Sequence, residues 1–299
     1  MNVVDKLVGL IRETSSSLPA DVIKALKAAQ RKEKKGSSAA VVLKTILDNC
    51  AIAAKRGTPL CQDTGTLTFF VDERLRRKVT PAVIKKAVSI ATEKGYLRKN
   101  TIDAVTGRSY DDNCAEGAPV VHYVAEASDS SDSRNSRKTR PTVTLILKGG
   151  GSENMSRQYS LPDAALGAGR DLEGVRKCIL DAVQKIQGYG CAPGILGVCI
   201  GGDRATGFEV AKEQLLRPLD EKRLQSTAVD GCRSGKNLAA FEKRLLREAN
   251  ELGIGPMGLG GKTTLLGVKI AARPRVPASF FVTVAYMCWA CRRKTAEIR

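Results

Sequence analysis

The sequence predicts a mixed α/β or α+β protein, with helices packed around a mixed β-sheet in one domain over residues 1–299. Segments with helical spacing of apolar residues alternate along the chain with short apolar runs typical of strands. No segment repeats with a fixed period, which argues against a solenoid or a propeller. Hydrophobic residues make up 42% of the 299 positions, enough to bury a sizeable core.

Three helices are expected at the N-terminus. A run of serines followed by Pro19 separates the first two, and Ser37 or Ser38 caps the third, which ends before Gly57. Helical spacing returns further along the chain. The expected helices cover residues 2–13, 20–34, 38–55, 80–95, 172–187, 205–216 and 237–251.

Strands are expected where short apolar runs are bounded by turn residues. These runs cover residues 66–71, 119–126, 142–147, 195–200, 265–271 and 280–286, and a basic tail follows. Residues 98–117 have few periodic apolar positions and predict an irregular loop. A loop of this length in a compact domain is usually functional or disordered. Residues 128–140 are Ser/Arg-rich and of low complexity, so they are expected to form an exposed insertion and not a domain boundary.

The net charge of +18 favours an acidic or polyanionic partner. The basic residues are dispersed along the chain, and no basic motif interleaved with aromatic residues appears. An acidic partner subunit, an anionic substrate or simple solubility explains the charge at least as well as nucleic acid does. Nucleic-acid binding is therefore the least favoured of these explanations.

The sequence favours a cytoplasmic protein with reduced cysteines. No apolar run approaches the roughly 18 residues of a membrane span, and the N-terminus lacks the features of a secretion signal. Nine cysteines spread over such a chain predict thiols rather than a disulfide framework. Cys178 and Cys199 lie in helix-like and strand-like runs and are expected to be core residues.

Three other cysteines lie beside turn-forming residues. Cys61 lies in a polar loop before a strand. Cys191 is surrounded by glycine and proline, and Cys288 lies near the end of the last expected strand. Glycine and proline leave backbone amides available to a neighbouring sulfur, which suits a thiolate that binds a metal. The alternative is three unrelated cysteines in turns and core.

Several further motifs carry weaker signals. Cys288 and Cys291 form a lone C-x-x-C without the second half of a zinc site, so Cys291 is expected to be an incidental thiol. Residues 255–264 approach a P-loop pattern, but Pro256 replaces a required glycine and a strand follows. The single histidine, His122, lies in a strand-like run and is expected to be structural.

Gly149, Gly150 and Gly151 directly follow an expected strand. Three glycines allow the backbone to approach a ligand closely and to present N–H groups to an anion. The alternative is a flexible turn. These glycines are a candidate binding element only in combination with other motifs.

Taken together, the motifs resemble the iron–sulfur (class I) fumarases and L-tartrate dehydratases, in particular their α subunit or N-terminal domain. The resemblance covers nearly the whole chain in the right order. The segments that carry it are Cys61-Gln62-Asp63-Thr64-Gly65-Thr66 and residues 148–154, 190–194, 253–261 and 278–293.

The resemblance implies a 4Fe–4S cluster held by Cys61, Cys191 and Cys288, with one iron open to substrate. One arrangement compatible with the resemblance places two lobes of the domain around the cluster. The reaction implied is the reversible hydration or dehydration of a dicarboxylate (fumarate and malate, or tartrate). Asp63 would be catalytic, near the substrate hydroxyl. The substrate-binding residues implied are Gln62, Asp63, Arg98, Gly149, Gly150 and Gly151.

The resemblance also implies a partner. The base of the family and several of its cationic residues lie on a β subunit or C-terminal domain that this sequence does not contain. A separate β subunit in an α2β2 assembly is therefore expected to complete the catalyst.

Two departures from the family qualify this expectation. Val276 stands twelve residues before Cys288, where the fumarases carry a histidine, and valine neither donates a hydrogen bond nor carries a proton. Residues 109–114 replace the usual loop that contains Asn-Thr-Gly. Val276 motivates a second hypothesis, a cluster-binding homologue with altered or lost catalysis. A basic nucleic-acid-associated protein is the third, motivated by charge alone.

Overall fold

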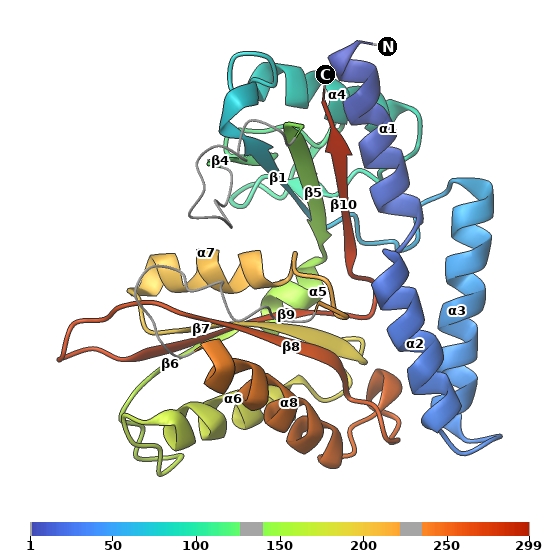
Figure 1. Ribbon diagram of the computed structural model, residues 1–299. Helices are drawn as coiled ribbons and strands as arrows, with labels where there is room; N and C mark the ends of the chain where they lie inside the picture. Colours follow the sequence, from blue (N-terminus) through green and yellow to red (C-terminus); the bar gives the residue numbers. More distant parts are fainter. Residues whose placement is uncertain (1, 126–139, 222–234, 299) are drawn as a thin grey trace. The chain divides into compact units, whose positions relative to one another are not determined.

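A computed structural model describes residues 2–125, 140–221 and 235–298 (Figure 1). Helices and strands are mixed, which confirms the predicted fold class. The chain forms two compact units, here called unit 1 and unit 2. Unit 1 comprises Met1–Pro19, Asp48–Gly150 and Ala290–Arg299, and unit 2 comprises Ala20–Leu47 and Gly151–Trp289. The insertion predicted at residues 128–140 lies almost entirely outside the described residues.

Unit 1 is built on a four-stranded sheet in the order β10-β5-β1-β4. The central strand β1 runs parallel to β4 and antiparallel to β5, and β10 is antiparallel to β5. Two short strands form a separate ribbon. The strands are β1 (Thr66–Asp72), β2 (Thr101–Ile102), β3 (Ser109–Tyr110), β4 (Val120–Val124), β5 (Thr142–Lys148) and β10 (Arg292–Glu297).

Helices α1 (Val3–Ser16) and α4 (Pro81–Glu93) pack against one another and contribute to one core with the sheet. Every second side chain of β1 points into this core: Leu67, Phe69 and Val71 belong to the same buried cluster, as expected for one face of a strand. Thr80 begins α4 by accepting a hydrogen bond from the amide of Val83, a standard N-cap. A short 3-10 helix, η1 (Glu73–Leu75), follows β1.

The sequence did not predict a strand in the basic segment at the end of the chain, where residues Arg292–Glu297 form the edge strand β10. Its sequence, Arg-Arg-Lys-Thr-Ala-Glu, lacks the apolar alternation that signals a strand. Edge strands commonly carry charged residues, which discourage pairing with other chains. Arg292, at the start of this strand, is nevertheless 2% exposed.

Unit 2 contains a second four-stranded sheet in the order β6-β9-β7-β8, with helices on both faces (Figure 1). Strands β7 and β8 are parallel, whereas β9 is antiparallel to both β7 and β6. The strands are β6 (Arg157–Ser160), β7 (Gly194–Ile200), β8 (Leu265–Ala272) and β9 (Phe281–Met287). The helices are α2 (Ala20–Lys32), α6 (Leu172–Ile186), α7 (Arg204–Gln214), α8 (Gly235–Glu251) and the 3-10 helix η3 (Pro256–Gly258).

Two further helices cross from one unit to the other. Helix α3 (Ser38–Arg56) begins in unit 2 and ends in unit 1, and α5 (Gly150–Asn154) begins at the last residue of unit 1. Most predicted helices and strands are present within a few residues of their expected ends. The sequence did not predict α5 or β6. No helix in the described ranges is both long and apolar enough to cross a lipid bilayer.

The two faces of β7 differ in side-chain size, and this sets how closely helices approach. Leu196 and Val198 belong to the core that α6 and α8 cover. On the other face lies Gly197, where a Cβ would stand 2.0 Å from the carbonyl oxygen of Ala211 in α7. A side chain at 197 would therefore force α7 away from the sheet.

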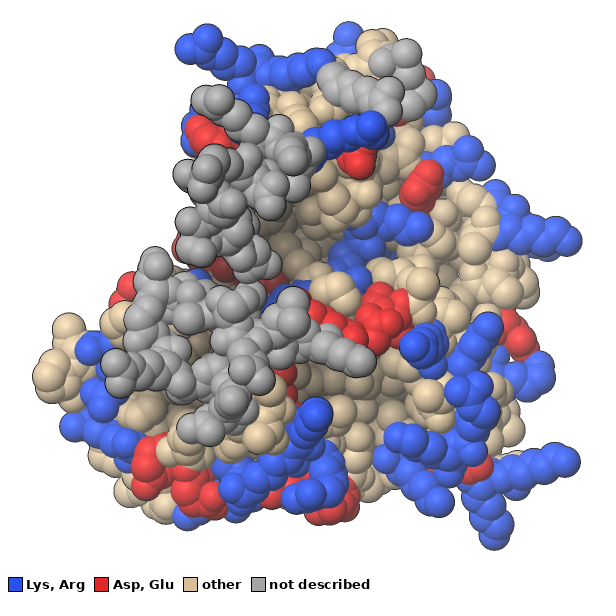
Figure 2. All heavy atoms as spheres, viewed as in Figure 1, with Lys and Arg blue, Asp and Glu red and all other residues tan. Residues whose placement is uncertain are grey.

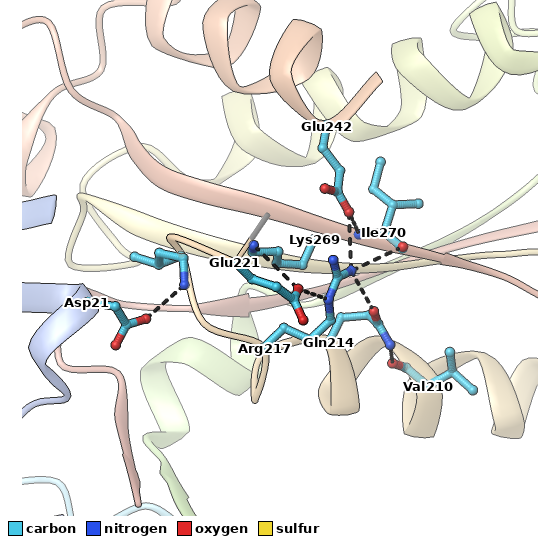
Figure 3. Close-up of polar contacts among 9 residues, drawn as sticks. Asp21, Val210, Gln214, Arg217, Glu221, Glu242, Lys269 and Ile270 are labelled. Carbon is cyan, nitrogen blue, oxygen red and sulfur yellow. Dashed lines mark hydrogen bonds and ion pairs between the residues drawn. The ribbon is translucent and has the colours of Figure 1, made fainter. Parts of the chain in front are cut away.

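A polar network ties the segment after α7 to the rest of unit 2 (Figure 3). Arg217 donates to Glu242 of α8 at 3.3 Å and to Glu221 at 2.8 Å. Glu242 also accepts the amide of Ile270 in β8 at 2.7 Å. The amide of Leu219 donates to Asp21 of α2 at 2.8 Å. Through these half-buried and exposed side chains, the segment after α7 is hydrogen-bonded to α8 and α2.

Candidate functional site

The loop from Thr58 to Gly65, here called the Cys61 loop, joins α3 to β1 in unit 1. Its beginning is fixed by Leu60, whose amide donates to the carbonyl of Ser15 at 2.9 Å. The carbonyl of Leu60 accepts from the side chain of Asn49 in α3 at 3.1 Å. Leu60 is buried, whereas Cys61 is half-buried and Gln62 is exposed. The loop thus anchors one apolar residue and presents the next two outward.

Asp63 is held by donors from two other segments of unit 1. Its Oδ2 accepts the backbone N–H of Gly150 at 2.7 Å, and its Oδ1 accepts from Nδ2 of Asn100 at 3.3 Å. Gly150 begins α5, so the carboxylate lies where the amides at a helix start favour negative charge. Asp63 is half-buried and its position is set by hydrogen bonds at both oxygens. The structure therefore brings together three of the predicted elements, Asp63, Gly149 and Gly150.

Gly65 allows the Cys61 loop to approach the end of β5. Its φ is +76°, and a Cβ on it would lie 2.4 Å from the carbonyl oxygen of Lys148. Both the backbone conformation and the lack of space require glycine here. The close approach places Asp63 beside Gly149, where a Cβ would stand 2.8 Å from Oδ2 of Asp63.

Arg98 is exposed, and its backbone is tied to the Cys61 loop by Thr64. Oγ1 of Thr64 donates to the Arg98 carbonyl and accepts its amide, both at 2.9 Å. These paired bonds fix the Arg98 backbone next to Asp63, while the guanidinium stays accessible to solvent. The arginine predicted to bind a carboxylate therefore lies in the same part of unit 1 as the predicted catalytic aspartate.

Asn113 is a structural centre of this region that sequence reasoning missed. It is fully buried, with a φ of +60° that asparagine tolerates better than most residues. Its Oδ1 accepts the amides of Asn100 and Thr101 at 2.8 and 3.1 Å. Its Nδ2 donates to Thr92 at 3.0 Å and to the Arg98 carbonyl at 2.9 Å. The loop that departs from the family thus supplies the residue that positions Arg98 and Asn100.

Replacing Asn113 by alanine is expected to lower the free energy of unfolding by about 2–4 kcal/mol, because several buried polar groups lose their partner at once. Urea unfolding would measure the loss. Asp111→Ala is the matched control on the same loop, since its ion pair with Lys99 is exposed and should contribute less than about 1 kcal/mol. Equal losses for the two variants would contradict a positioning role for Asn113.

Cys191 and Cys288 lie in unit 2, at the same end of the second sheet. Cys191 precedes β7 and Cys288 follows β9, and these strands are paired neighbours. The amide of Trp289 donates to the carbonyl of Cys191 at 3.4 Å, which links the two turns directly. Cys191 has a φ of +50° and is exposed, while Cys288 is half-buried. Both are thiols rather than disulfides.

Tyr286 fills the space beneath this pair of cysteines. A Cβ on Gly190 would lie 2.7 Å from its ring, and one on Gly194 would lie 2.2 Å from it. The two glycines around Cys191 are therefore required by the packing of the tyrosine. Its pKa is raised well above the usual value by burial and then by the nearby Cys288 and Cys191 thiols. Its hydroxyl is buried and has no hydrogen-bond partner among the described residues.

Two serines position the end of β9. Oγ of Ser152, in α5, accepts the amide of Cys288 at 3.1 Å. One turn further, Oγ of Ser156 accepts the amide of Tyr286 at 3.2 Å. Ser152 and Ser156 belong to the region where the sequence predicted only a glycine loop. Serine at this spacing gives no distinctive sequence signal, because serine is common in turns.

The cysteines present fit an iron–sulfur cluster in their chemistry. Thiolates are the ligands such clusters prefer, and cluster sulfurs accept hydrogen bonds from nearby donors. The buried hydroxyl of Tyr286 has no partner among the described residues and would be available to donate to such a sulfur. The three predicted ligands are divided between the units, with Cys61 in unit 1 and the other two in unit 2. Neither unit, in its described part, contains by itself a group of three or more His, Cys, Asp or Glu placed to hold a metal ion.

The prediction that Cys178 and Cys199 are core residues is confirmed. Cys178 and Cys199 are fully buried, as expected for core residues, and burial raises their thiol pKa to about 12 and about 11. Cys291 is also fully buried. Cys114 is half-buried in the Asn113 loop, and its pKa is raised to about 11 by burial and by Asp112. The raised pKa values of the Cys114, Cys178 and Cys199 thiols make these three poor candidates for reactive or ligand roles.

The structure also shows the surroundings of the P-loop-like segment, His122 and Val276. Residues 255–264 do not form a P-loop, because β8 and not a helix follows them. His122 lies in β4 and stacks on Phe70 with ring centroids 5.1 Å apart, which is a packing role. Val276 is 63% exposed in the turn between β8 and β9. Its carbonyl accepts from Arg275 and from the amide of Ser279.

The basic residues are dispersed on the face of the molecule that Figure 2 shows. Figure 2 shows Lys and Arg side chains spread over the visible face and interspersed with Asp and Glu. Several are neutralised locally, for example Lys212 by Glu153 at 2.7 Å and Arg176 by Glu248 at 3.1 Å. This distribution gives no specific support to a nucleic-acid surface.

Comparison with known proteins places these features in one family. Residues 4–297 match the fumarate hydratase (Fumerase) family. The chain is 46% identical over 302 residues to a "Putative fumarate hydratase class I" from Geobacillus stearothermophilus. That alignment covers 98% of this chain but 54% of the relative, so the chain spans about half the length of that protein.

Two shorter relatives are aligned over most of their length. A "Putative L(+)-tartrate dehydratase subunit alpha" from Methanocaldococcus jannaschii is 33% identical over 306 residues, covering 100% of this chain and 98% of the relative. The L(+)-tartrate dehydratase subunit alpha of Escherichia coli K12 is 30% identical over 287 residues, covering 94% and 86%. The family match over nearly the whole sequence confirms the resemblance carried by the cysteine and glycine motifs: the chain belongs to the fumarate hydratase (Fumerase) family.

Proposed function

We propose that the chain is the α-type, cluster-bearing part of a hydro-lyase that reversibly adds water to a dicarboxylate, either fumarate and malate or tartrate. The observation that carries the proposal is the pairing of Cys191 with Cys288 beside the unpartnered hydroxyl of Tyr286. Relatives named as a fumarate hydratase and as tartrate dehydratase α subunits support the reaction class. A β-type second half, in an α2β2 assembly, is proposed to complete the catalyst.

We propose Cys61, Cys191 and Cys288 as the ligands of a 4Fe–4S cluster. Such a cluster, when bound, supplies an iron that polarises a substrate oxygen as a Lewis acid. The thiols are reduced, and those of Cys191 and Cys288 are accessible or half-buried, as ligands must be before a cluster is inserted.

Asp63 is proposed to hold the proton of the substrate hydroxyl. Its carboxylate is already oriented by Gly150 and Asn100, so little reorganisation is needed when substrate binds. The exposed guanidinium of Arg98 would bind a substrate carboxylate through charge-assisted hydrogen bonds, with the amide of Gln62 as a further donor. Gly149, Gly150 and Gly151 would admit a substrate oxygen close to the backbone, although the amide of Gly150 already donates to Asp63.

The test is to co-express the chain with its second half, purify the complex without oxygen, and supply iron and sulfide. The expected result is about four iron and four sulfide per chain, with turnover of fumarate, malate or tartrate. Failure to bind iron would overturn the proposal that this chain holds a 4Fe–4S cluster. Iron binding without turnover of any of the three substrates would overturn the hydro-lyase assignment and favour the homologue with lost catalysis that Val276 suggests.

A further inference from the structure

Arg292 is an unusual residue of unit 1, because its guanidinium is buried and forms no ion pair within the described part of the chain. The side chain is 2% exposed and is among the largest fully buried side chains of the protein. Its Nε has no hydrogen-bond partner, and no ion pair to the side chain is found, among the described residues. Buried charges in proteins are normally paired, since an isolated buried cation is strongly unfavourable.

The side chain of Arg292 points toward the region of Asp63. An ideal Cβ on Gly149 would lie 2.8 Å from Oδ2 of Asp63 and 4.0 Å from Nη2 of Arg292. The carboxylate and the guanidinium therefore converge on the same side of the Gly149 backbone. They are not ion-paired with each other among the described residues, and Asp63 instead accepts from Gly150 and Asn100.

The strand register explains how an arginine from the end of the chain reaches this place. Arg292 is paired with Leu147 in the antiparallel ladder between β10 and β5. Side chains of directly paired residues lie on the same face of a sheet, and Gly149 follows Leu147 by two residues. A side chain at Gly149 would collide with Oδ2 of Asp63, so glycine lets the carboxylate and the guanidinium lie beside the same backbone segment.

We propose that Arg292 is a substrate-binding residue that donates hydrogen bonds to a carboxylate of the dicarboxylate, beside Asp63 and Gly149. The proposal deepens the function proposed above and rests on it for the identity of the ligand. A guanidinium can donate two parallel hydrogen bonds to the two oxygens of a carboxylate. A halide ion, which is a single atom, cannot accept this pair of bonds in the same way. The charge of the ligand then supplies an ion-pair partner, which Arg292 lacks among the residues that the structure describes.

The first arm of the test needs no activity and uses the full chain alone. Arg292→Met keeps the apolar length and removes the charge, so urea unfolding should show equal or higher stability if the guanidinium has no partner in the free protein. Arg293→Met is the matched control, because the next residue of a strand points to the other face. A clear loss of stability for Arg292→Met would overturn the proposal in favour of a structural role.

The second arm measures ligand binding by the reconstituted complex, using succinate as an unreactive dicarboxylate. We expect succinate to raise the melting temperature of the unmodified protein and of Arg293→Met. Arg292→Met should weaken succinate binding by about 10- to 100-fold, as for the loss of a hydrogen bond to a charged group, and Arg292→Lys should restore part of it. The iron content should not change in any of these variants.

In turnover assays Arg292→Met should raise KM for the dicarboxylate by a similar factor, whereas the control Arg293→Met should not. Unchanged succinate binding in Arg292→Met would overturn the proposal even if the complex is an active hydro-lyase. Conversely, succinate binding that depends on Arg292 in a complex without turnover would support the binding role and count only against the proposed reaction. If inorganic phosphate raised the melting temperature as much as succinate does, the ligand of Arg292 would not be specifically a carboxylate and the proposal would be overturned.

Discussion

Cys288→Ser and Cys191→Ser are expected to abolish cluster binding and to reduce hydro-lyase turnover below detection. Serine preserves the size of the side chain but replaces a soft thiolate by an oxygen donor that iron–sulfur clusters bind poorly. The measurements are iron and sulfide content after anaerobic reconstitution, together with visible absorption. Each variant should fold, because Cys191 is exposed and Cys288 is half-buried.

Cys178→Ala is the matched control, since Cys178 is fully buried in α6 and its raised thiol pKa disfavours a ligand role. Its iron content should equal that of the unmodified protein. Cys61→Ser should behave like the other two ligand variants. If Cys61→Ser alone retained a complete cluster, the assignment of Cys61 as third ligand would be wrong while the pair in unit 2 would stand.

Gly65→Ala is expected to lower the free energy of unfolding by about 3–5 kcal/mol and to displace Asp63 from Gly150. Two effects add at this position: the positive φ, and a Cβ that would lie 2.4 Å from the backbone oxygen of Lys148. Backbone atoms of β5 cannot move away as a flexible side chain can. The loss is measured by urea unfolding, and dicarboxylate binding should fall with it.

Gly95→Ala separates the two effects within the same unit. Gly95 has a φ of +72°, close to that of Gly65, but nothing lies within 4 Å of a Cβ built on it. Its substitution should therefore cost only the conformational part, about 1–2 kcal/mol. If the two variants lost the same stability, close approach of the Cys61 loop to β5 would not be what the glycine provides.

Much of the fold could be predicted from the sequence because its signals are local. Helical spacing and strand-like runs located α1, α4, α6, β1, β7 and β9 to within a few residues. Apolar surroundings identified Cys178 and Cys199 as core thiols. The strand β10 was missed because its residues are mostly charged, and it is a strand only through pairing with β5.

Parts of the candidate site could not be predicted, because they depend on residues that are distant in sequence. Asp63 and Gly150 are 87 positions apart, and their hydrogen bond exists only once β1 pairs with β5. The role of Asn113 follows from four partners and a positive φ, none of which a single sequence reveals. The sequence shows that residues 109–114 differ from the family motif, but not that Asn113 of this loop positions Arg98 and Asn100.

The sequence by itself determined the fold class, the family and the cysteines to consider, since turn residues and apolar periodicity are properties of neighbouring positions. Only the tertiary structure decided which side chains converge. It placed the Tyr286 ring against Gly190 and Gly194, and it buried Arg292 near Gly149 with its Nε unpaired among the described residues. The physical reason is that burial and hydrogen-bond satisfaction belong to the packed chain as a whole, whereas sequence patterns report the conformation of each segment.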